Sequence, residues 1–354
     1  MPIWRRQTLR LLNQPDPLIG LDIGSQTIKV AQLLPKRGNW HLQNCGVKSL
    51  PWPAREEEGE GSEMAIEVAI RELVQEGALT RNQVACSIKG PSVMVKYIQV
   101  PNMTGPELGE HLGWEMDQYI PSDVNNIHWD YQIVDHGNQE ASNGLMSVLL
   151  VAVKKEAVQK RVELIQRSGL QPVVMDVDAI ALSNMYAFNY DSGDSEEVLL
   201  VHVSPSGVDM SVIKAGIPIF MREIEVWGDE YKNLMERIVR NGQTDKSSVD
   251  PVDLSDFSER ILKEISKEVN KIIEYCLDMV PPLQIQKLFL GGGYSRIPGL
   301  AKTLEVEVDR PLELINPLKK LDVLSKLKGR DSIRNFKSLG GVAIGLALRA
   351  FDDG

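Results

Sequence analysis

Residues 21–29 read LDIGSQTIK, the sequence of a strand, a tight turn and the start of a second strand. An apolar strand ends within it, and the carboxylate of Asp22 lies close to the end of that strand. Gly24 and Ser25 then indicate a tight turn, after which residues 27–34 have the composition of a second strand. The backbone N–H groups and hydroxyls of such a turn attract anions, so this hairpin is a candidate phosphate loop.

Six residues of the hairpin are candidates for binding a phosphate. They are Asp22, Gly24, Ser25, Gln26, Thr27 and Lys29. We expect Asp22 to orient a magnesium-bound water beside the phosphate, because magnesium keeps most of its waters and takes few carboxylates directly. The alternative is a plain β-hairpin in which Asp22 caps its own turn.

The pattern of the opening residues recurs later in the chain. Residues 18–50 predict a meander of three strands, and residues 198–226 predict another, with a turn at residues 204–207. Such self-similarity indicates a duplicated architecture. The second turn is therefore a candidate second phosphate loop, to which Ser206 and Gly207 would contribute.

Three glycines follow a short apolar strand near the end of the second repeat. Residues 287–290 predict the strand, and Gly291, Gly292 and Gly293 come directly after it. Glycine permits positive φ and very close approach of a ligand, so these residues are candidates for contacting a nucleotide. The spacing is not GxGxxG, which disfavours a dinucleotide site. The alternative is a strand-to-helix turn that needs glycine for packing.

Residues 84–168, between the two meanders, alternate short strands with helices. Thr104 and Glu107 have the spacing of a capping box at the start of one such helix. We expect Trp114 and Tyr119 of this helix to pack in the core, and the alternative is that they line a groove for a peptide.

Three helices are predicted in the rest of the chain. One spans residues 229–240, and a long one begins with Ser255 as its cap and ends near Met279. A helix rich in small residues, at 338–351, closes the chain.

The composition limits the possible partners. The 354 residues carry a net charge of −10, which argues against nucleic acid because phosphate binding needs a basic surface. The apolar run at residues 145–153 is far shorter than the roughly 20 residues of a membrane span. Residues 1–13 form a basic segment with an aromatic side chain, which either touches an anionic membrane surface or packs locally as a frayed terminus.

The order of the two hairpins and the late glycine turn resembles the actin, Hsp70 and sugar-kinase superfold, an α/β fold of duplicated ribonuclease H-like lobes. Within that superfold, GWEMDQYIP at residues 113–121 and IHWDY at residues 127–131 resemble the signature of the type IV pilus assembly PilM family, which is related to FtsA. MDVDAIAL at residues 175–182 resembles the family's segment that returns from an inserted subdomain, and residues 341–351 resemble its closing helix.

The resemblance implies a division into a tail, two lobes and an insert. The ranges are a basic tail at 1–16, a first lobe at 17–84, 165–190 and 330–354, an inserted subdomain at 85–164, and a second lobe at 191–329.

The resemblance also implies a function. The chain would be a cytosolic adaptor, peripheral at the inner membrane, that binds ATP with magnesium between its lobes. It would hold the cytosolic N-terminal peptide of a PilN-like inner-membrane protein in a groove involving the insert, and so connect the pilus platform with its motor proteins. The alternatives are a kinase of the same superfold and an adaptor of the FtsA-like or type II secretion kind.

The second phosphate loop departs from the family pattern. His202, Val203 and Ser204 stand where the family usually has Asp-Ile-Gly, and Pro205 removes a backbone donor. Imidazole is a poor substitute for a carboxylate beside magnesium, which prefers oxygen ligands. We therefore expect hydrolysis to be lost or very slow and nucleotide binding to be weakened. The alternative is that Ser206 and Gly207 still hold phosphate and that binding persists.

Overall fold

The first predicted hairpin forms as strands β1 (Ile19–Ile23) and β2 (Thr27–Lys36), which pair antiparallel with Asp22 opposite Lys29. All five residues of β1 are buried, as expected for a strand in the middle of a sheet that is covered on both faces. Strand β3 (Asn39–Ser49) pairs antiparallel with β2 and completes the predicted meander.

The structure is a computed structural model in which the chain divides into two compact units. It describes residues 18–36, 39–50, 60–76, 79, 81–121, 123–135, 144–190, 196–214, 216–224, 251–278, 283–324, 327 and 331–349. The first unit comprises Met1–Asp191, Gly216–Met221 and Pro317–Gly354, and the second comprises Ser192–Ala215 and Arg222–Asn316. The predicted helix at 229–240 lies outside the described residues.

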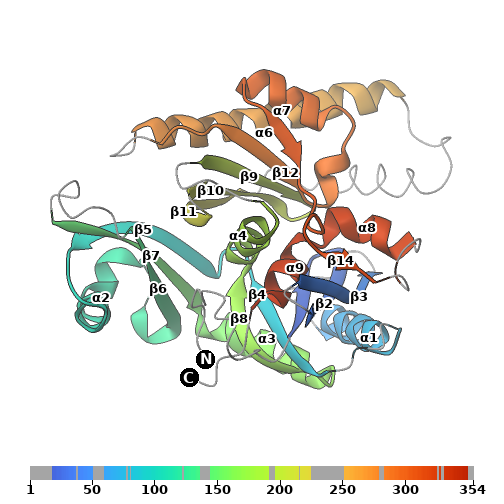
Figure 1. The fold of residues 1–354 in the computed structure, drawn as a ribbon, viewed down its shortest axis with the longest axis horizontal. Helices are drawn as coiled ribbons and strands as arrows, with labels where there is room; N and C mark the ends of the chain where they lie inside the picture. The colour runs from blue at the N-terminus through green and yellow to red at the C-terminus, as the bar shows by residue number, and fades with distance from the viewer. Residues whose placement is uncertain are drawn as a thin grey trace. The chain divides into compact units, whose positions relative to one another are not determined.

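The meander belongs to a six-stranded sheet in the first unit, with the order β14-β3-β2-β1-β4-β8 (Figure 1). Strand β4 (Gln83–Ile88) runs parallel to β1, and β8 (Gln171–Val177) runs parallel to β4. The short strand β14 (Asp322–Val323) pairs parallel with β3 at the opposite edge. The carboxyl ends of β1, β4 and β8 therefore meet at one edge of the sheet.

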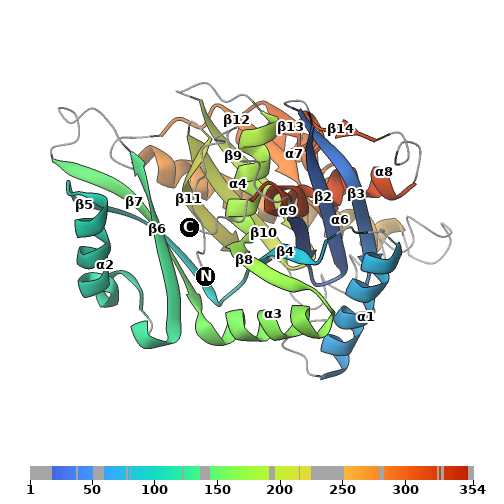
Figure 2. The same ribbon diagram turned by 60° about the horizontal axis from the view of Figure 1, so that its bottom comes forward.

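Helices cover both faces of this sheet (Figure 2). Helices α1 (Glu60–Glu76) and α3 (Lys155–Arg167) lie on one face, and α4 (Asp178–Asn189) and α9 (Gly341–Ala347) lie on the other. A further helix, α8 (Asp331–Leu339), contacts β3.

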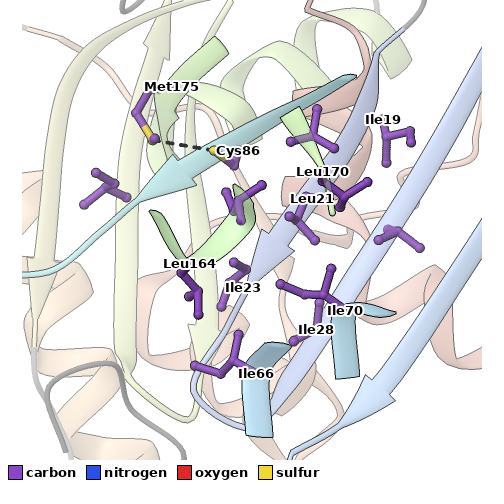
Figure 3. Close-up of a cluster of buried hydrophobic side chains, with 14 of the residues drawn as sticks. Ile19, Leu21, Ile23, Ile28, Ile66, Ile70, Cys86, Leu164, Leu170 and Met175 are labelled. Carbon is purple, nitrogen blue, oxygen red and sulfur yellow. Dashed lines mark hydrogen bonds between the residues drawn. The ribbon is translucent and has the colours of Figure 1, made fainter. Parts of the chain in front are cut away.

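Alternate residues of β1 face opposite layers, as the period of a strand requires. Ile19, Leu21 and Ile23 belong to a buried cluster that also contains Ile66 of α1 and Leu164 of α3 (Figure 3). These side chains form the core between the sheet and the helices α1 and α3.

Helix α9 approaches its neighbours backbone to backbone. A Cβ atom on Gly20 of β1 would lie 1.9 Å from the carbonyl oxygen of Ala343, and one on Gly345 would lie 1.8 Å from the carbonyl oxygen of Ala181. Only glycine permits either approach, which explains the small residues of this segment.

The prediction of a single closing helix at residues 338–351 is wrong. Ser338 belongs to α8, which ends at Leu339, and α9 begins at Gly341. A Cβ atom on Gly340 would lie 2.4 Å from the ring of Phe336, so the chain bends closely around that aromatic side chain.

A three-stranded sheet lies between β4 and β8 in the sequence, with the order β5-β7-β6. Its strands are β5 (Val93–Pro101), β7 (Leu145–Lys154) and β6 (Ile127–Asp135). The central strand β7 is buried on both faces.

Alternate residues of β7 contribute to two clusters of buried side chains. One set joins the cluster that includes Ile19, and consists of Leu149, Val151 and Val153. The other set packs beneath helix α2 (Gly105–Tyr119), and consists of Met146, Val148, Leu150 and Ala152. The strand thus serves two cores at once.

Helix α2 begins with the predicted capping box, which is confirmed. The backbone N–H and the hydroxyl of Thr104 both donate to the carboxylate of Glu107, at 2.8 and 2.7 Å. A short 3-10 helix at Val124–Asn126 then leads into β6.

A second sheet repeats the strand order of the first. Its order β11-β10-β9-β12-β13 matches β3-β2-β1-β4-β8 strand for strand, and it lies in the second unit except for residues 217–221 of β11, which belong to the first. The strands are β9 (Glu197–Ser204), β10 (Gly207–Lys214), β11 (Ile217–Ile224), β12 (Lys287–Gly291) and β13 (Leu312–Leu314). The predicted repeat is confirmed.

Two helices contact each other in the second unit, α6 (Pro251–Asp278) and α7 (Leu300–Val308). Helix α6 begins four residues before Ser255, so the prediction that Ser255 caps it is wrong. Its apolar stripe is buried, from Ile261 to Cys276. Among the described residues, no helix of either unit is long and apolar enough to cross a membrane.

Candidate functional site

The first hairpin places a cation against the candidate carboxylate. Lys29 Nζ lies 3.1 Å from Asp22 Oδ2, and only 11% and 7% of the two side chains are exposed. The antiparallel register puts the residues opposite each other on β1 and β2. Asp22 is therefore a carboxylate that is already paired within its own hairpin.

The tight turn of this hairpin requires its glycine. The backbone N–H of Gly24 donates to the carbonyl oxygen of Thr27 at 3.1 Å. A Cβ atom at Gly24 would lie 2.8 Å from Lys29 Nζ and 3.0 Å from the Thr27 oxygen. The carbonyl oxygen of Gln26 accepts from the backbone N–H of Leu50 at 2.8 Å, which ties the turn to the end of β3.

Ser25 supplies the observation that tests whether a phosphate fits. Its hydroxyl oxygen is buried and has no hydrogen-bond partner in the described part of the chain. Buried polar atoms without a partner are rare and require an explanation, such as a ligand or a water. A phosphate beside Gly24 would accept a hydrogen bond from this hydroxyl and would lie near the ammonium of Lys29, so the hairpin fits an anionic ligand.

The second hairpin has the same topology with a tighter turn. Ser204 and Gly207 form its closing pair, and Gly207 has a φ of 146°. The hydroxyl of Ser204 lies 2.9 Å from that of Ser206 and donates to the carbonyl oxygen of Gly207 at 3.3 Å. These hydroxyls therefore bond within the turn, unlike that of Ser25.

The altered position His202 faces a carboxylate that the sequence analysis missed. His202 Nδ1 lies 3.3 Å from Asp209 Oδ2, and the two side chains are 13% and 10% exposed. Like the first hairpin, this one places an acidic side chain opposite a basic one. In the first hairpin the acid lies on the first strand, whereas here Asp209 lies on the second strand, β10. Counting the register back from the pair of Ser204 and Gly207 would have found Asp209, because the sum of paired residue numbers is constant along an antiparallel ladder.

The glycine run is used at least in part for packing. Gly291 ends β12 opposite His202, and Gly293 begins a 3-10 helix (Gly293–Arg296). Gly292 has a φ of 92°, and a Cβ atom there would lie 2.3 Å from the carbonyl oxygen of Val203 on β9. The alternative that glycine serves the strand-to-helix turn therefore accounts for Gly292.

The carboxyl edge of the first sheet gathers further polar residues that were not predicted as site residues. The hydroxyl of Ser87 at the end of β4 donates to Asp178 Oδ1 at 2.6 Å, and Lys89 Nζ lies 3.9 Å from Asp178 Oδ2. Arg161 donates to the carbonyl oxygen of Ser87 at 3.0 Å. Ligands of open α/β sheets bind beyond the carboxyl ends of the strands, and this rule would have singled out Asp178 directly after β8.

A buried acid lies two residues before Asp178. Asp176 is fully buried on β8, its Oδ2 lies 3.3 Å from Arg349 Nε, and its Oδ1 accepts from the backbone N–H of Val177. Burial raises the pKa of this carboxyl to about 6, while the charge of Arg349 acts in the opposite direction. No group of three or more His, Cys, Asp or Glu side chains that could hold a metal is found among the described residues.

The expectation that Trp114 packs in the core is wrong. Its side chain on α2 is 87% exposed, although its neighbours Leu108, Leu112 and Met116 are buried. Tyr119 is half-buried, packs against the α2 cluster and donates to Glu115 at 2.9 Å. Burial raises the pKa of Tyr119, and its hydrogen bond to the Glu115 carboxylate acts in the same direction.

Comparisons with known proteins bear on the whole chain. A family model described as type IV pilus assembly protein PilM matches residues 20–351. A solved structure described as a PilM–PilN type IV pilus biogenesis complex is 22% identical, covers 96% of this chain and 100% of that chain, and has a TM-score of 0.77. The ethanolamine utilization protein EutJ from Carboxydothermus hydrogenoformans is 10% identical, covers 96% of this chain and 91% of that chain, and has a TM-score of 0.52. These similarities confirm the predicted actin-like fold of duplicated lobes.

Proposed function

Because this chain belongs to the type IV pilus assembly protein PilM family, we propose that it is an actin-like adaptor that binds the cytosolic N-terminal peptide of a PilN-like inner-membrane protein. The observation that carries this proposal is the similarity to the solved PilM–PilN complex, which extends over 100% of that chain. On this proposal the protein lies in the cytoplasm, peripheral at the inner membrane. It connects the pilus platform with its motor proteins and does not act on nucleic acid.

The three-stranded sheet supports a role in peptide binding. Strands β5 and β6 are the edge strands of that sheet, so each presents backbone N–H and C=O groups along one side. An extended peptide can pair with such an edge, and alternate side chains then enter pockets on the sheet. We propose that residues 85–164 form the inserted subdomain that contributes to this groove, with the first lobe at 17–84, 165–190 and 330–354 and the second at 191–329.

We also propose that the protein binds ATP with magnesium through its hairpins. Gly24, Ser25 and Lys29 would contact phosphate in the first hairpin, with Gln26 and Thr27 completing the turn. Ser206, Gly207 and the glycine run at 291–293 are the proposed contacts in the second unit. Magnesium would neutralise phosphate charge, and Asp22 would orient one of its waters.

The charge pairs of the hairpins favour binding over turnover. Asp22 is engaged by Lys29, and the carboxylate of Asp209 is engaged by His202. Phosphoryl transfer also needs a group that positions the nucleophile; on this proposal Asp22 serves a magnesium-bound water, and Asp209 is held by His202. We therefore propose that nucleotide occupancy, rather than hydrolysis, is what the adaptor uses.

The test is a calorimetric titration of the full chain with the synthetic N-terminal peptide of the PilN-like protein encoded in the same genome. We expect saturable binding at one site. A peptide of the same composition in scrambled order serves as the control and should not bind. Equal heats for the two peptides, or no binding by the native one, would overturn the proposal.

A further inference from the structure

Helix α2 carries one exposed stripe that its own unit does not cover. The α2 stripe consists of Glu107, Glu110, Trp114, Asp117 and Gln118, all of which are exposed. At 100° per residue these positions fall within roughly a third of the helix circumference, so they form a single face. The opposite face packs on the sheet through Leu108, Leu112 and Met116.

The centre of the stripe is an aromatic side chain in water. Trp114 is 87% exposed, the highest exposure among the large hydrophobic side chains of the described residues. Tryptophan contributes a large apolar area when it is covered, and it dominates the binding energy of many protein interfaces. The capping box, the buried face of α2 and Tyr119 all have structural explanations, whereas the position of Trp114 has none within the described chain.

The charges around Trp114 define what would cover it. Glu110 lies one turn before Trp114 and Asp117 lies one turn after it, and neither has an ion-pair partner in the part of the chain that the structure describes. Hydrogen bonds from Thr104 lower the pKa of Glu107, which adds a third carboxylate at the start of the stripe. An indole face with carboxylates on both sides attracts a cation.

The direction of α2 strengthens this attraction. The C-terminal end of a helix carries a partial negative charge, where Lys or Arg is favourable and Asp is unfavourable. The last turn of α2 has no basic residue and contains Asp117. Asp117 therefore lowers the stability of the isolated helix, and a cation bound from a partner would offset this unfavourable interaction.

We propose that the α2 stripe docks a basic segment of a partner protein, with an arginine or lysine over the indole of Trp114 and further cations at Glu110 and Asp117. The partner is a protein segment, because a phosphate backbone or an anionic lipid would be repelled by the same carboxylates. This surface is additional to the groove proposed for the PilN-like peptide. The DQYIP motif at residues 117–121 then has a structural part and a binding part. Tyr119 and Ile120 pack inward, while Asp117 and Gln118 face the partner.

The probe is a synthetic peptide of about ten residues with four arginines spaced by alanines, a length of nearly three helical turns. Binding to the full chain is followed through the indole N–H resonances, and that of Trp114 is identified by its loss in Trp114→Phe. We expect a saturable shift of the Trp114 resonance, weakened by salt. A peptide with glutamates in place of the arginines should leave it unmoved.

Variants distinguish binding at the α2 stripe from attraction of the peptide to the net negative charge of the protein. Glu110→Lys with Asp117→Lys should weaken binding at least about tenfold, because like charges then face the peptide. Trp114→Ala should weaken it roughly three- to tenfold, whereas Trp114→Phe keeps part of the interaction. The matched control is Glu264→Lys with Glu305→Lys, which changes the net charge equally at exposed positions of α6 and α7. Equal affinity of the two double variants, or an unmoved Trp114 resonance, would overturn the proposal.

Discussion

Lys29 neutralises Asp22 from the facing strand, with Nζ and Oδ2 3.1 Å apart in a largely buried hairpin. The second unit keeps the same seven-residue separation between its acid and its base but exchanges their order, with His202 on β9 and Asp209 on β10. Both hairpins thus place a carboxylate opposite a nitrogen-bearing side chain, with the carboxylate on the first strand in one hairpin and on the second strand in the other.

We expect Lys29→Met to lower the free energy of unfolding by about 3 kcal/mol, because it leaves the buried carboxylate of Asp22 without a partner. Urea denaturation monitored by circular dichroism gives the value. The double variant Asp22→Asn with Lys29→Met removes both charges and should recover much of the loss. If the double variant is as unstable as the sum of the two single variants, the residues are not coupled and the pair has no structural role.

Gly292→Ala should be far more damaging than Gly90→Ala. Both glycines have positive φ, 92° and 84°, and at Gly292 a ψ of 168° adds a region that is essentially restricted to glycine. A Cβ atom at Gly292 would also lie 2.3 Å from the Val203 carbonyl oxygen, whereas one at Gly90 meets nothing within 4 Å. The difference between their melting temperatures measures the combined cost of the clash and the backbone strain at Gly292, and equal values would contradict the close packing of Gly292 on β9.

Ser25→Ala should separate ligand binding from stability. The Ser25 hydroxyl has no partner in the described chain, so its removal should leave thermal stability unchanged or slightly higher without ligand. The affinity for Mg-ATP, measured by calorimetry, should fall about three- to tenfold, because one neutral hydrogen bond to phosphate is lost. A marked loss of stability without ligand would show that the hydroxyl is structural.

The buried pair of Asp176 and Arg349 predicts a dependence of stability on pH. Burial raises the pKa of Asp176 from its ordinary 3.8 to about 6, so the folded chain keeps a proton that the unfolded chain releases. This contribution to stability is complete below about pH 4 and is lost as the pH rises through 6. The stability of the wild type relative to Asp176→Asn should therefore fall by about 2 kcal/mol between pH 4.5 and pH 7.

Urea denaturation of both proteins across this range provides the measurement. Because the comparison is between two chains that share every other titrating group, the remaining pH dependence cancels to first order. A constant difference would mean that Asp176 ionises in the folded protein as it does in the unfolded chain.

Much of the fold followed from local patterns. The hairpin at LDIGSQTIK, its repetition near residue 200 and the capping box of Thr104 all depend on residues close together in the sequence, and the structure confirms each. Helix starts were less predictable. Ser255 has the chemistry of a cap but lies inside α6, because the helix continues four residues further toward Pro251.

The parts of the candidate site that escaped prediction depend on strand register and on the orientation of a helix, which local composition does not specify. The pairing of Asp22 with Lys29 and that of His202 with Asp209 both follow from the strand register, which composition alone does not give. The prediction for Trp114 failed for a different reason. Hydrophobicity favours burial, but the helical period places Trp114 on the side opposite Leu112 and Met116, and only the orientation of α2 on its sheet decides which side is covered.

The position of α9 has a consequence for the order in which the protein is made. Residues 317–349 belong to the first unit, and Gly345 rests against Ala181, yet the ribosome produces them after the whole second unit. During synthesis, the face of β1 that α9 covers therefore stays exposed until the second unit has been synthesised. A chain that ended at residue 316 would contain all residues of the second unit but would lack α8 and α9 of the first.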